Sequence, residues 1–320
     1  MTEETPNIYN TNNSNVEAYV NIGTSKNENI IPFFLPIKVY FELIKTKQTF
    51  LLVYTGVLTY LISSWKDFSL FTLSWLIIAL FFSISGSTLL NMYIDQDIDK
   101  IMERTKNRAL ASGKIAEETV VGHGIVFTIS GIMSAVVFLN ALTGLVILLG
   151  AFFDVIIYSY WLKRRTRFSI LFGGIAGALP AIAGRTAAIN KIDSLAIMFG
   201  VFILAWIPMH ILTLALIPKN LEGYQLAGVP MWPVVKGKDR TIIVITLSSI
   251  ISAIITILIS LSLKVNIVIH ILACLTALFF IFLSIKNLIR PSEKTTWLIF
   301  KLASMFMVMA FLLWLLGIIF

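Results

Sequence analysis

The sequence predicts an all-α, polytopic membrane protein with about nine transmembrane helices. Of its 320 residues, 58% are hydrophobic and only 13% are charged, and the mean hydropathy is +0.88. Soluble domains average about 25% charged residues, so this chain lacks the polar surface that a soluble domain of this size needs. Apolar runs long enough to cross a hydrocarbon core of about 30 Å recur along the chain. The composition therefore indicates a protein that lies in a lipid bilayer.

Nine apolar segments are predicted to cross the bilayer as helices. In chain order they are residues 49–65, 71–92, 121–138, 142–162, 168–187, 194–216, 241–262, 265–286 and 296–320. The chain before them is rich in Asn, Ser and Thr, contains no Arg and lacks a hydrophobic segment, which argues against a signal or transit peptide. We expect residues 1–35 to form a disordered cytoplasmic tail and residues 36–320 to form one membrane domain.

The placement of basic residues predicts the orientation of the chain. The net charge is +8, and 20 of the 25 Lys and Arg residues lie in the N-terminal tail or in alternate loops between spans. Such a pattern is typical of cytoplasmic loops and does not indicate a nucleic-acid partner. We therefore expect a multi-pass protein of the plasma membrane with a cytoplasmic N-terminus and an external C-terminus.

The second predicted span ends in a stripe of polar side chains. Asn91, Asp95 and Asp99 recur every four residues, so on a helix they point the same way, while Asp97 projects to the opposite side. Stacked carboxylates are costly near hydrocarbon unless a positive charge lies between them. Mg²⁺ is the natural cation, because proteins hold it by one or two carboxylates together with substrate phosphates. The alternative is a solvated helix end with ordinary surface acids.

Basic residues follow the stripe at once and occur again after the fourth span. Arg104 and Arg108 lie just beyond the stripe, while Lys163 and Arg164 follow Asp154, an ionisable residue in an otherwise apolar span. Guanidinium groups bind phosphate oxygens in pairs, so acids and bases together suit a metal-bound diphosphate. The alternative is that these loops only orient the chain, which requires charge without particular spacing.

The connection after the sixth span is dense in proline and glycine, which sets a fixed turn structure around Tyr224. His210 lies near the cytoplasmic end of the sixth span. A lone histidine in a span is often only hydrogen-bonded to a neighbouring helix, and this is our interpretation of His123 and His270.

With these residues, the chain resembles the UbiA-type intramembrane prenyltransferases, and within them the branch that acts on protoheme IX. That branch carries Asn-x-x-x-Asp-x-x-x-Asp followed by Met-x-Arg-Thr-x-x-Arg-Pro-Leu. The matching residues here are Asn91, Asp95, Asp99, Met102, Arg104, Thr105, Arg108 and Leu110. A second block, around Leu-Lys-Arg-x-Thr and Gly-Gly-x-x-Gly-Ala-x-Pro, matches Tyr158, Leu162, Lys163, Arg164, Thr166, Gly173, Gly174, Gly177, Ala178 and Pro180. A third block, Pro-Pro-His and Asp-Tyr-x-x-Ala-Gly-x-Pro-Met, matches Pro208, His210, Tyr224, Ala227, Gly228, Pro230 and Met231.

The chain departs from the family pattern at a few positions. Arg-Pro-Leu reads Arg108-Ala109-Leu110, and the second proline of Pro-Pro-His is Met209. Lys45-Thr-Lys47 stands where the family has Thr-Lys-Pro-Arg. The residues assigned to diphosphate are kept, and the changes near His210 concern the acceptor.

The resemblance implies a central cavity that opens to lipid, with a polar cap on the cytoplasmic side. It implies transfer of a farnesyl group, or a longer group such as geranylgeranyl, from its diphosphate to a vinyl group of heme b, with Mg²⁺ as cofactor. It assigns the metal to Asn91, Asp95 and Asp99, and catalysis to Asp95, Asp99, Arg104 and Arg108. The substrate-binding residues that it assigns are Lys47, Asp154, Tyr158, Lys163, Arg164, Tyr224 and, as a heme contact, His210.

Two other functions remain open from the sequence. Within the same enzyme class, the acceptor could be an aromatic quinone precursor or another lipid, although such enzymes carry a second acidic cluster where this chain has Lys163-Arg164-Arg165. A transporter is the alternative from a different class. Transporters place ionisable groups near the middle of their spans, whereas here these groups gather at one face.

Overall fold

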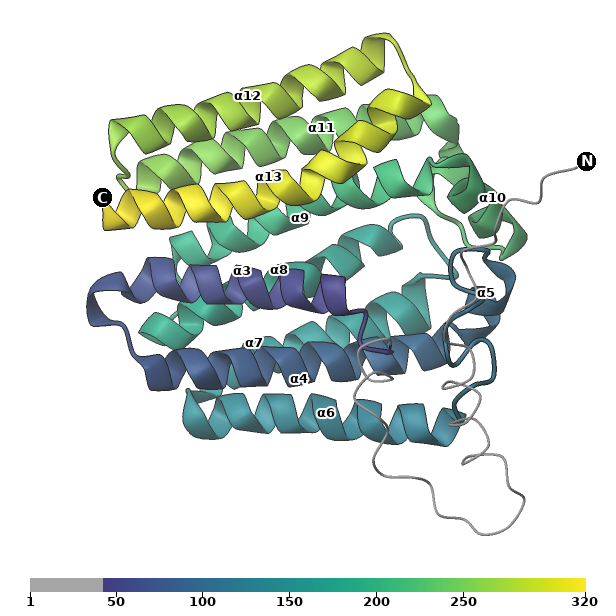
Figure 1. Ribbon diagram of the computed structural model, residues 1–320, viewed down its shortest axis with the longest axis horizontal. Coiled ribbons are helices and arrows are strands. Elements are labelled where there is room, and N and C mark those ends of the chain that lie inside the picture. Colours follow the sequence, from purple (N-terminus) through teal and green to yellow (C-terminus); the bar gives the residue numbers. More distant parts are fainter. Residues whose placement is uncertain (1–42) are drawn as a thin grey trace, which may run out of the picture.

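The computed structural model describes residues 43–320, and the predicted tail, residues 1–35, lies outside the described residues. In the described part the chain folds entirely into helices and connections (Figure 1). The long helices are α3 (Thr46–Ser64), α4 (Leu70–Ile94), α6 (Glu117–Phe138), α7 (Ala141–Ala151) continued by the π-helix η2 (Phe152–Leu162), α8 (Ser169–Ile189), α9 (Ser194–Ala215), α11 (Trp232–Ser262), α12 (Ile267–Ile289) and α13 (Glu293–Ile319). The all-helical prediction is confirmed, and each predicted span corresponds to one long helix.

Within residues 43–320, eight helices are long and apolar enough to cross a membrane, and α3 is the predicted span that is not among them. Helix α3 carries Lys47 and Gln48 in its first turn and buries threonines such as Thr55 and Thr59. Thr59 Oγ1 donates to the Thr55 carbonyl oxygen at 2.7 Å, so its hydroxyl needs no water. Helix α3 nevertheless runs alongside the other spans, against α4, α8 and α13 (Figure 1).

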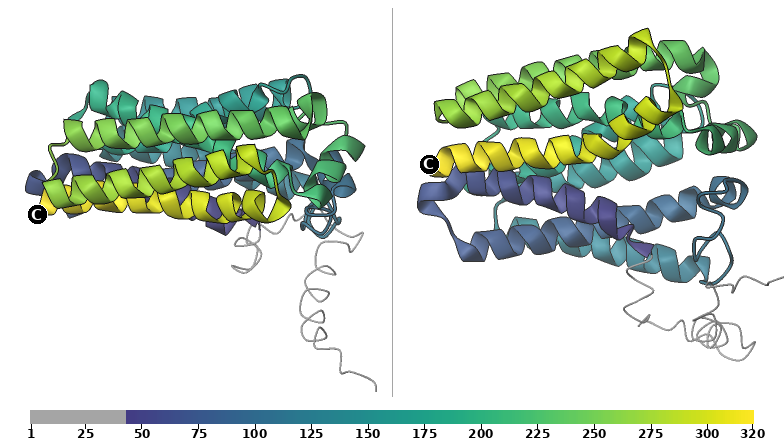
Figure 2. Two further views of the ribbon diagram at one scale, coloured as in Figure 1. Left: turned by 90° about the horizontal axis from the view of Figure 1, so that it is seen from above. Right: turned by 45° about the horizontal axis from the view of Figure 1, so that its top comes forward.

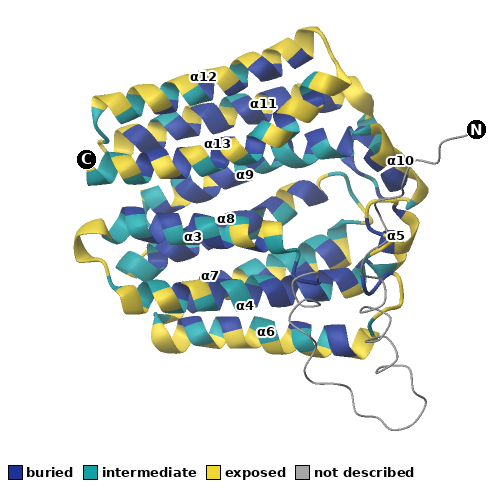
Figure 3. Ribbon diagram, in the orientation of Figure 1, coloured by how far each residue is buried: buried dark blue, intermediate teal, exposed yellow. Residues whose placement is uncertain are grey.

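The helices pack in two groups around two apolar cores. One group contains α3, α4, α6, α7 and α8, and the other contains α9, α11, α12 and α13, but α3 and α8 contribute buried residues to both cores. The pairs α8–α9 and α3–α13 join the two groups, and Figure 2 shows the bundle from two further directions. Exposed apolar residues cover the outer faces of α6 and α12, at the two margins of the bundle (Figure 3). Because these faces carry apolar side chains, they suit contact with lipid.

A close approach of two backbones fixes α3 against α8. A Cβ atom at Gly184 would overlap the carbonyl oxygen of Gly56 and lie 3.0 Å from the backbone nitrogen of Tyr60. Small residues allow helices in membranes to approach in this way. The contact holds α3 in place, and the N-terminal end of α3 leads directly to the candidate site.

Two short helices, α5 (Gln96–Ile101) and α10 (Pro218–Leu226), lie at one end of the bundle, opposite the C-terminus (Figure 1). We call this the polar end. The predicted stripe was placed on one continuous helix, which is not quite correct, because α4 ends at Ile94 and Asp95 (φ −93°, ψ 6°) separates it from α5. Backbone bonds still run from Asp95 N to Asn91 O (2.9 Å) and from Asp99 N to Asp95 O (2.8 Å). The four-residue spacing therefore survives the break.

The seventh predicted span, residues 241–262, begins too late. Helix α11 starts at Trp232, and Gly237 interrupts it with φ 78° and ψ 174°. A positive φ is readily adopted by glycine because it has no Cβ atom. Charged residues gather around Gly237, at Lys236, Lys238, Asp239 and Arg240, and this explains why hydropathy did not include the start of α11.

Candidate active site at the polar end of the bundle

Three ion pairs tie the segment after α4 to two later connections. Asp95 pairs with Lys163, Asp99 accepts from Arg108 Nη1 at 2.5 Å, and Asp97 pairs with Arg164 at 2.6 Å. Asp95 and Asp99 are 5% and 4% exposed, whereas the side chain of Asp97 is 65% exposed. As the helical spacing predicts, two carboxylates face the interior and the third faces outward.

A fourth polar contact joins the stripe to the fourth span. Asn91 Nδ2 donates to Asp154 Oδ2 at 2.7 Å. Asp154 lies in η2, a π-helical segment of the kind that often occurs at functional sites. Asp154 therefore belongs to the same cluster as the stripe, although it is more than 50 residues away along the chain.

Two buried oxygen atoms in this cluster have no hydrogen-bond partner among the residues that the structure describes. They are Asn91 Oδ1 and Asp95 Oδ1. Leaving buried acceptors unpaired is costly, and a hard divalent cation is a ligand that oxygen atoms bind. No group of three or more His, Cys, Asp or Glu side chains is arranged to hold a metal within residues 43–320. Asn91 Oδ1 and Asp95 Oδ1 would thus supply only part of the ligand set of an Mg²⁺ ion, and substrate phosphates and water would supply the rest.

Lys45 is the site residue that the sequence assignment missed. Burial and the charges of Arg108 and Lys163 lower its pKa to about 8, against the opposing effect of Asp95 and Asp99. Its backbone is left-handed, with φ 46° and ψ 58°, a conformation that is uncommon for a residue other than glycine and is frequent at functional sites.

The assigned residue of the same motif, Lys47, is exposed on the first turn of α3. The motif around Lys45-Thr-Lys47 signalled a basic contact without indicating which lysine points inward.

The basic partners at the site remain charged. Burial disfavours the ammonium group of Lys163, but Tyr158 and Asp95 outweigh it and raise the pKa of Lys163. The hydrogen bonds with Asp97 raise the pKa of Arg164, and Arg164 holds the pKa of Asp97 below its usual range. Acidic neighbours thus favour the charged forms of Lys163 and Arg164.

The remaining assigned residues lie at different distances from this cluster. The Tyr158 ring centroid is 5.8 Å from Lys163 Nζ. Tyr224 is 9% exposed and packs on Ile98 and Met102, beside the stripe. Arg104 is exposed, and the part of the chain that the structure describes offers it no ion pair, so the structure does not bring it into the cluster.

His210 lies apart from the acids and bases, in an aromatic stack. Its ring is 4.7 Å from that of Trp206 and 5.0 Å from that of Phe300, and its buried Nδ1 atom has no hydrogen-bond partner in the described part of the chain. Next to it, Ser248 Oγ accepts from the backbone nitrogen of Met209 at 2.9 Å and donates to the Ala205 carbonyl oxygen. The Ser248 hydroxyl thus bridges the Met209 N–H and the Ala205 carbonyl oxygen of α9, one residue before His210.

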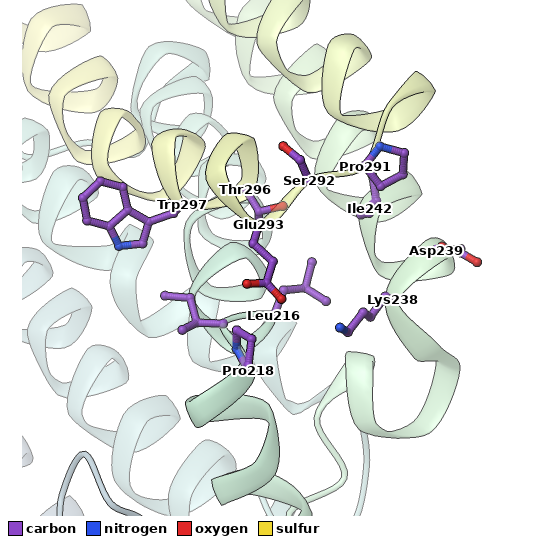
Figure 4. Close-up of a pocket in the computed structure, with 11 residues that line it drawn as sticks. Leu216, Pro218, Lys238, Asp239, Ile242, Pro291, Ser292, Glu293, Thr296 and Trp297 are labelled. Atoms are coloured by element: carbon purple, nitrogen blue, oxygen red, sulfur yellow. The ribbon is translucent and has the colours of Figure 1, made fainter.

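A cavity of about 380 Å³ also lies at the polar end, between α9, α10, α11 and α13 (Figure 4). Its lining includes Lys238, Glu293 and Trp297, and none of the predicted site residues. The acid–base cluster is therefore separate from this cavity.

These observations define a multi-pass helical membrane protein with a buried acid–base cluster at one end, suited to bind a metal ion and an anion together. The chain belongs to the UbiA prenyltransferase family, whose model matches residues 51–315. It is therefore a membrane prenyltransferase by family.

Several relatives share the sequence over most of its length. A protoheme IX farnesyltransferase from Korarchaeum cryptofilum is 37% identical over 262 residues, which is 82% of this chain and 87% of the relative. Another protoheme IX farnesyltransferase, from Archaeoglobus fulgidus, is 31% identical over 284 residues, which is 88% of this chain and 98% of the relative.

Solved structures share the fold. A structure of digeranylgeranylglyceryl phosphate synthase superposes with a TM-score of 0.74 at 22% identity, covering 88% of this chain and 98% of the other. A UbiA homologue from Archaeoglobus fulgidus, bound to DMAPP and Mg²⁺, superposes with a TM-score of 0.64 at 18% identity, covering 86% and 98%. The predicted family is confirmed.

Proposed function

We propose that this protein transfers a farnesyl or longer prenyl group from its diphosphate to a vinyl group of heme b, giving heme O and diphosphate. The observation that carries the chemistry is the pairing of the buried Asp95 and Asp99 with Lys163 and Arg108. The acceptor rests on the relatives named protoheme IX farnesyltransferase, which are 31–37% identical over more than four fifths of this chain.

The bases of the cluster would bind the diphosphate. Lys163 and Arg108 each neutralise one carboxylate in the absence of substrate, and Lys45 adds a third cation. When a diphosphate binds, Lys163 and Arg108 leave their carboxylate partners and contact phosphate oxygens. The three cations then stabilise the negative charge that develops on the leaving group. Removing one such preorganised donor typically slows an enzyme by about 10²–10³-fold.

Asn91, Asp95 and Asp99 would hold Mg²⁺. The unpartnered oxygens of Asn91 and Asp95 support this assignment. When bound, the ion supplies charge neutralisation at the departing diphosphate. The prenyl C–O bond then breaks, the vinyl π electrons bond to the prenyl carbon, and water attacks the resulting cation and loses a proton. The product carries a hydroxyl and one prenyl chain.

We place the polar end on the cytoplasmic face of the plasma membrane. The basic loops between residues 96 and 118, and between residues 163 and 167, support this orientation, because positive charge marks cytoplasmic loops. Reporter fusions after residues 110, 165 and 235 should score cytoplasmic, and fusions after residues 67, 190 and 264 external. An external signal after residue 165 would contradict the orientation.

Diphosphate release from purified protein tests the function. With farnesyl diphosphate and Mg²⁺, release should require heme b and should fail with Asp95→Asn, whereas Asp193→Asn, at the opposite end, should remain active. Release that depends on an aromatic quinone precursor in place of heme would overturn the acceptor and keep the prenyltransferase. No acceptor-dependent release at all would overturn both.

A further inference from the structure

A second basic group at the polar end has no acidic partner within residues 43–320. Arg167 lies four residues beyond Lys163, in the connection that leads into α8. Its guanidinium carbon is 4.7 Å from the ring centroid of Phe168 and 5.3 Å from that of Trp232. The two rings are 5.3 Å apart and nearly perpendicular. Arg167 thus lies against both members of an edge-to-face aromatic pair, whose rings come from the starts of α8 and α11.

Two hydrogen-bond donors in this arrangement are buried and unpaired. They are Arg167 Nε and Trp232 Nε1, each without a partner in the described part of the chain. Both groups are donors only, so neither can satisfy the other. Buried donors left without an acceptor carry a desolvation cost, which an acceptor from another molecule would remove.

We propose that Arg167 and Trp232 bind a carboxylate of the prenyl acceptor. A guanidinium group is charged at all physiological pH values and matches a carboxylate with paired N–H donors. Heme b carries two propionate carboxylates on the edge of the macrocycle opposite its vinyl groups. This inference rests on the proposed function for the identity of the acceptor. The chemistry of the site itself requires only a carboxylate carried by an aromatic ring system.

The position of Arg167 distinguishes it from the diphosphate cluster. Lys163 and Arg164 face Asp95 and Asp97 on the α4–α5 side, whereas Arg167 contacts a ring of α11. Trp232 also packs against the apolar core that contains Trp206, so an acceptor bound there has apolar surface beside its carboxylate. One connection, residues 163–168, therefore supplies basic groups to two neighbouring anions.

Heme binding in detergent, followed by the Soret band, tests the proposal with two ligands, heme b and its dimethyl ester. The wild-type protein should bind heme b about tenfold to a hundredfold more tightly than the ester, because the ester keeps the ring and loses both charges. Arg167→Gln should remove this preference, Arg167→Lys should keep part of it, and Trp232→Phe should weaken heme b binding severalfold. Arg240→Gln, an exposed arginine on α11, is the matched control.

The outcomes separate this proposal from the proposed function. If the wild type binds heme b and its ester equally, the carboxylate site is wrong and the heme acceptor stands. If Arg167→Gln lowers only thermal stability and keeps the preference, the contact of Arg167 with the aromatic pair is structural and the proposal is overturned. If heme does not bind but an aromatic carboxylate such as 4-hydroxybenzoate binds in an Arg167-dependent manner, the site stands and the heme acceptor fails.

Discussion

Replacing Lys163 with methionine should destabilise the folded protein strongly. Lys163 and Asp95 form an ion pair whose side chains are only 14% and 7% exposed. Removing one partner of a buried pair leaves the other charge uncompensated, which costs about 3–5 kcal/mol. Within the described residues Asp95 Oδ1 makes no hydrogen bond, so Lys163 is the side chain that pairs directly with this carboxylate.

The magnitude can be measured by denaturant unfolding in detergent micelles, with two comparisons. The double variant Lys163→Met with Asp95→Asn should recover most of the lost stability, because it removes the orphaned charge. Arg164→Met, one residue further on, breaks a pair whose side chains are 40% and 65% exposed and should cost at most about 1 kcal/mol. Equal losses for the two single variants, or additive losses in the double variant, would refute the reasoning.

Three further predictions concern the site and its scaffold. Asp99→Asn should leave a folded protein without prenyl transfer, and near-normal turnover of this variant in EDTA would contradict the metal assignment. Arg185 holds the pKa of Asp193 below its usual range, so the charged pair stabilises the protein above about pH 4. This gain in the free energy of unfolding, at most about 1 kcal/mol for a partly exposed pair, should disappear as the pH falls through the lowered pKa. In a profile of thermal unfolding against pH, Asp193→Asn should therefore reduce the loss of stability at acid pH. Gly184→Ala should destabilise by about 1–3 kcal/mol in denaturant unfolding, because its Cβ meets backbone, whereas Gly122→Ala, with open space around it, should not.

Much of the fold follows from hydropathy because membrane spans must be long and apolar. The spans predicted from hydropathy differ most from the structure where a helix is less apolar. Helix α3 buries hydroxyl groups against its neighbours and is therefore less apolar than a lipid-facing helix. The start of α11 is predicted too late because charged residues gather around Gly237. In both cases tertiary contacts, which hydropathy does not report, decide the outcome.

The site was predictable as far as helical spacing reaches. Spacing by four residues correctly separates the buried Asp95 and Asp99 from the exposed Asp97. Spacing does not indicate which base meets which acid, since these pairs join distant segments. It also does not distinguish Lys45 from Lys47, because Lys45 lies before the helix in a left-handed conformation.

The central claim is that this protein attaches a prenyl chain to heme. The most direct test is mass analysis of heme extracted from cells that express the wild-type protein, the Asp95→Asn variant, or neither. Expression of the wild type should produce a heme heavier than heme b by one prenyl chain and one hydroxyl group, and the variant should produce only heme b. If the hemes are identical in all three cell lines while the wild-type protein is folded in the membrane, the claim is contradicted.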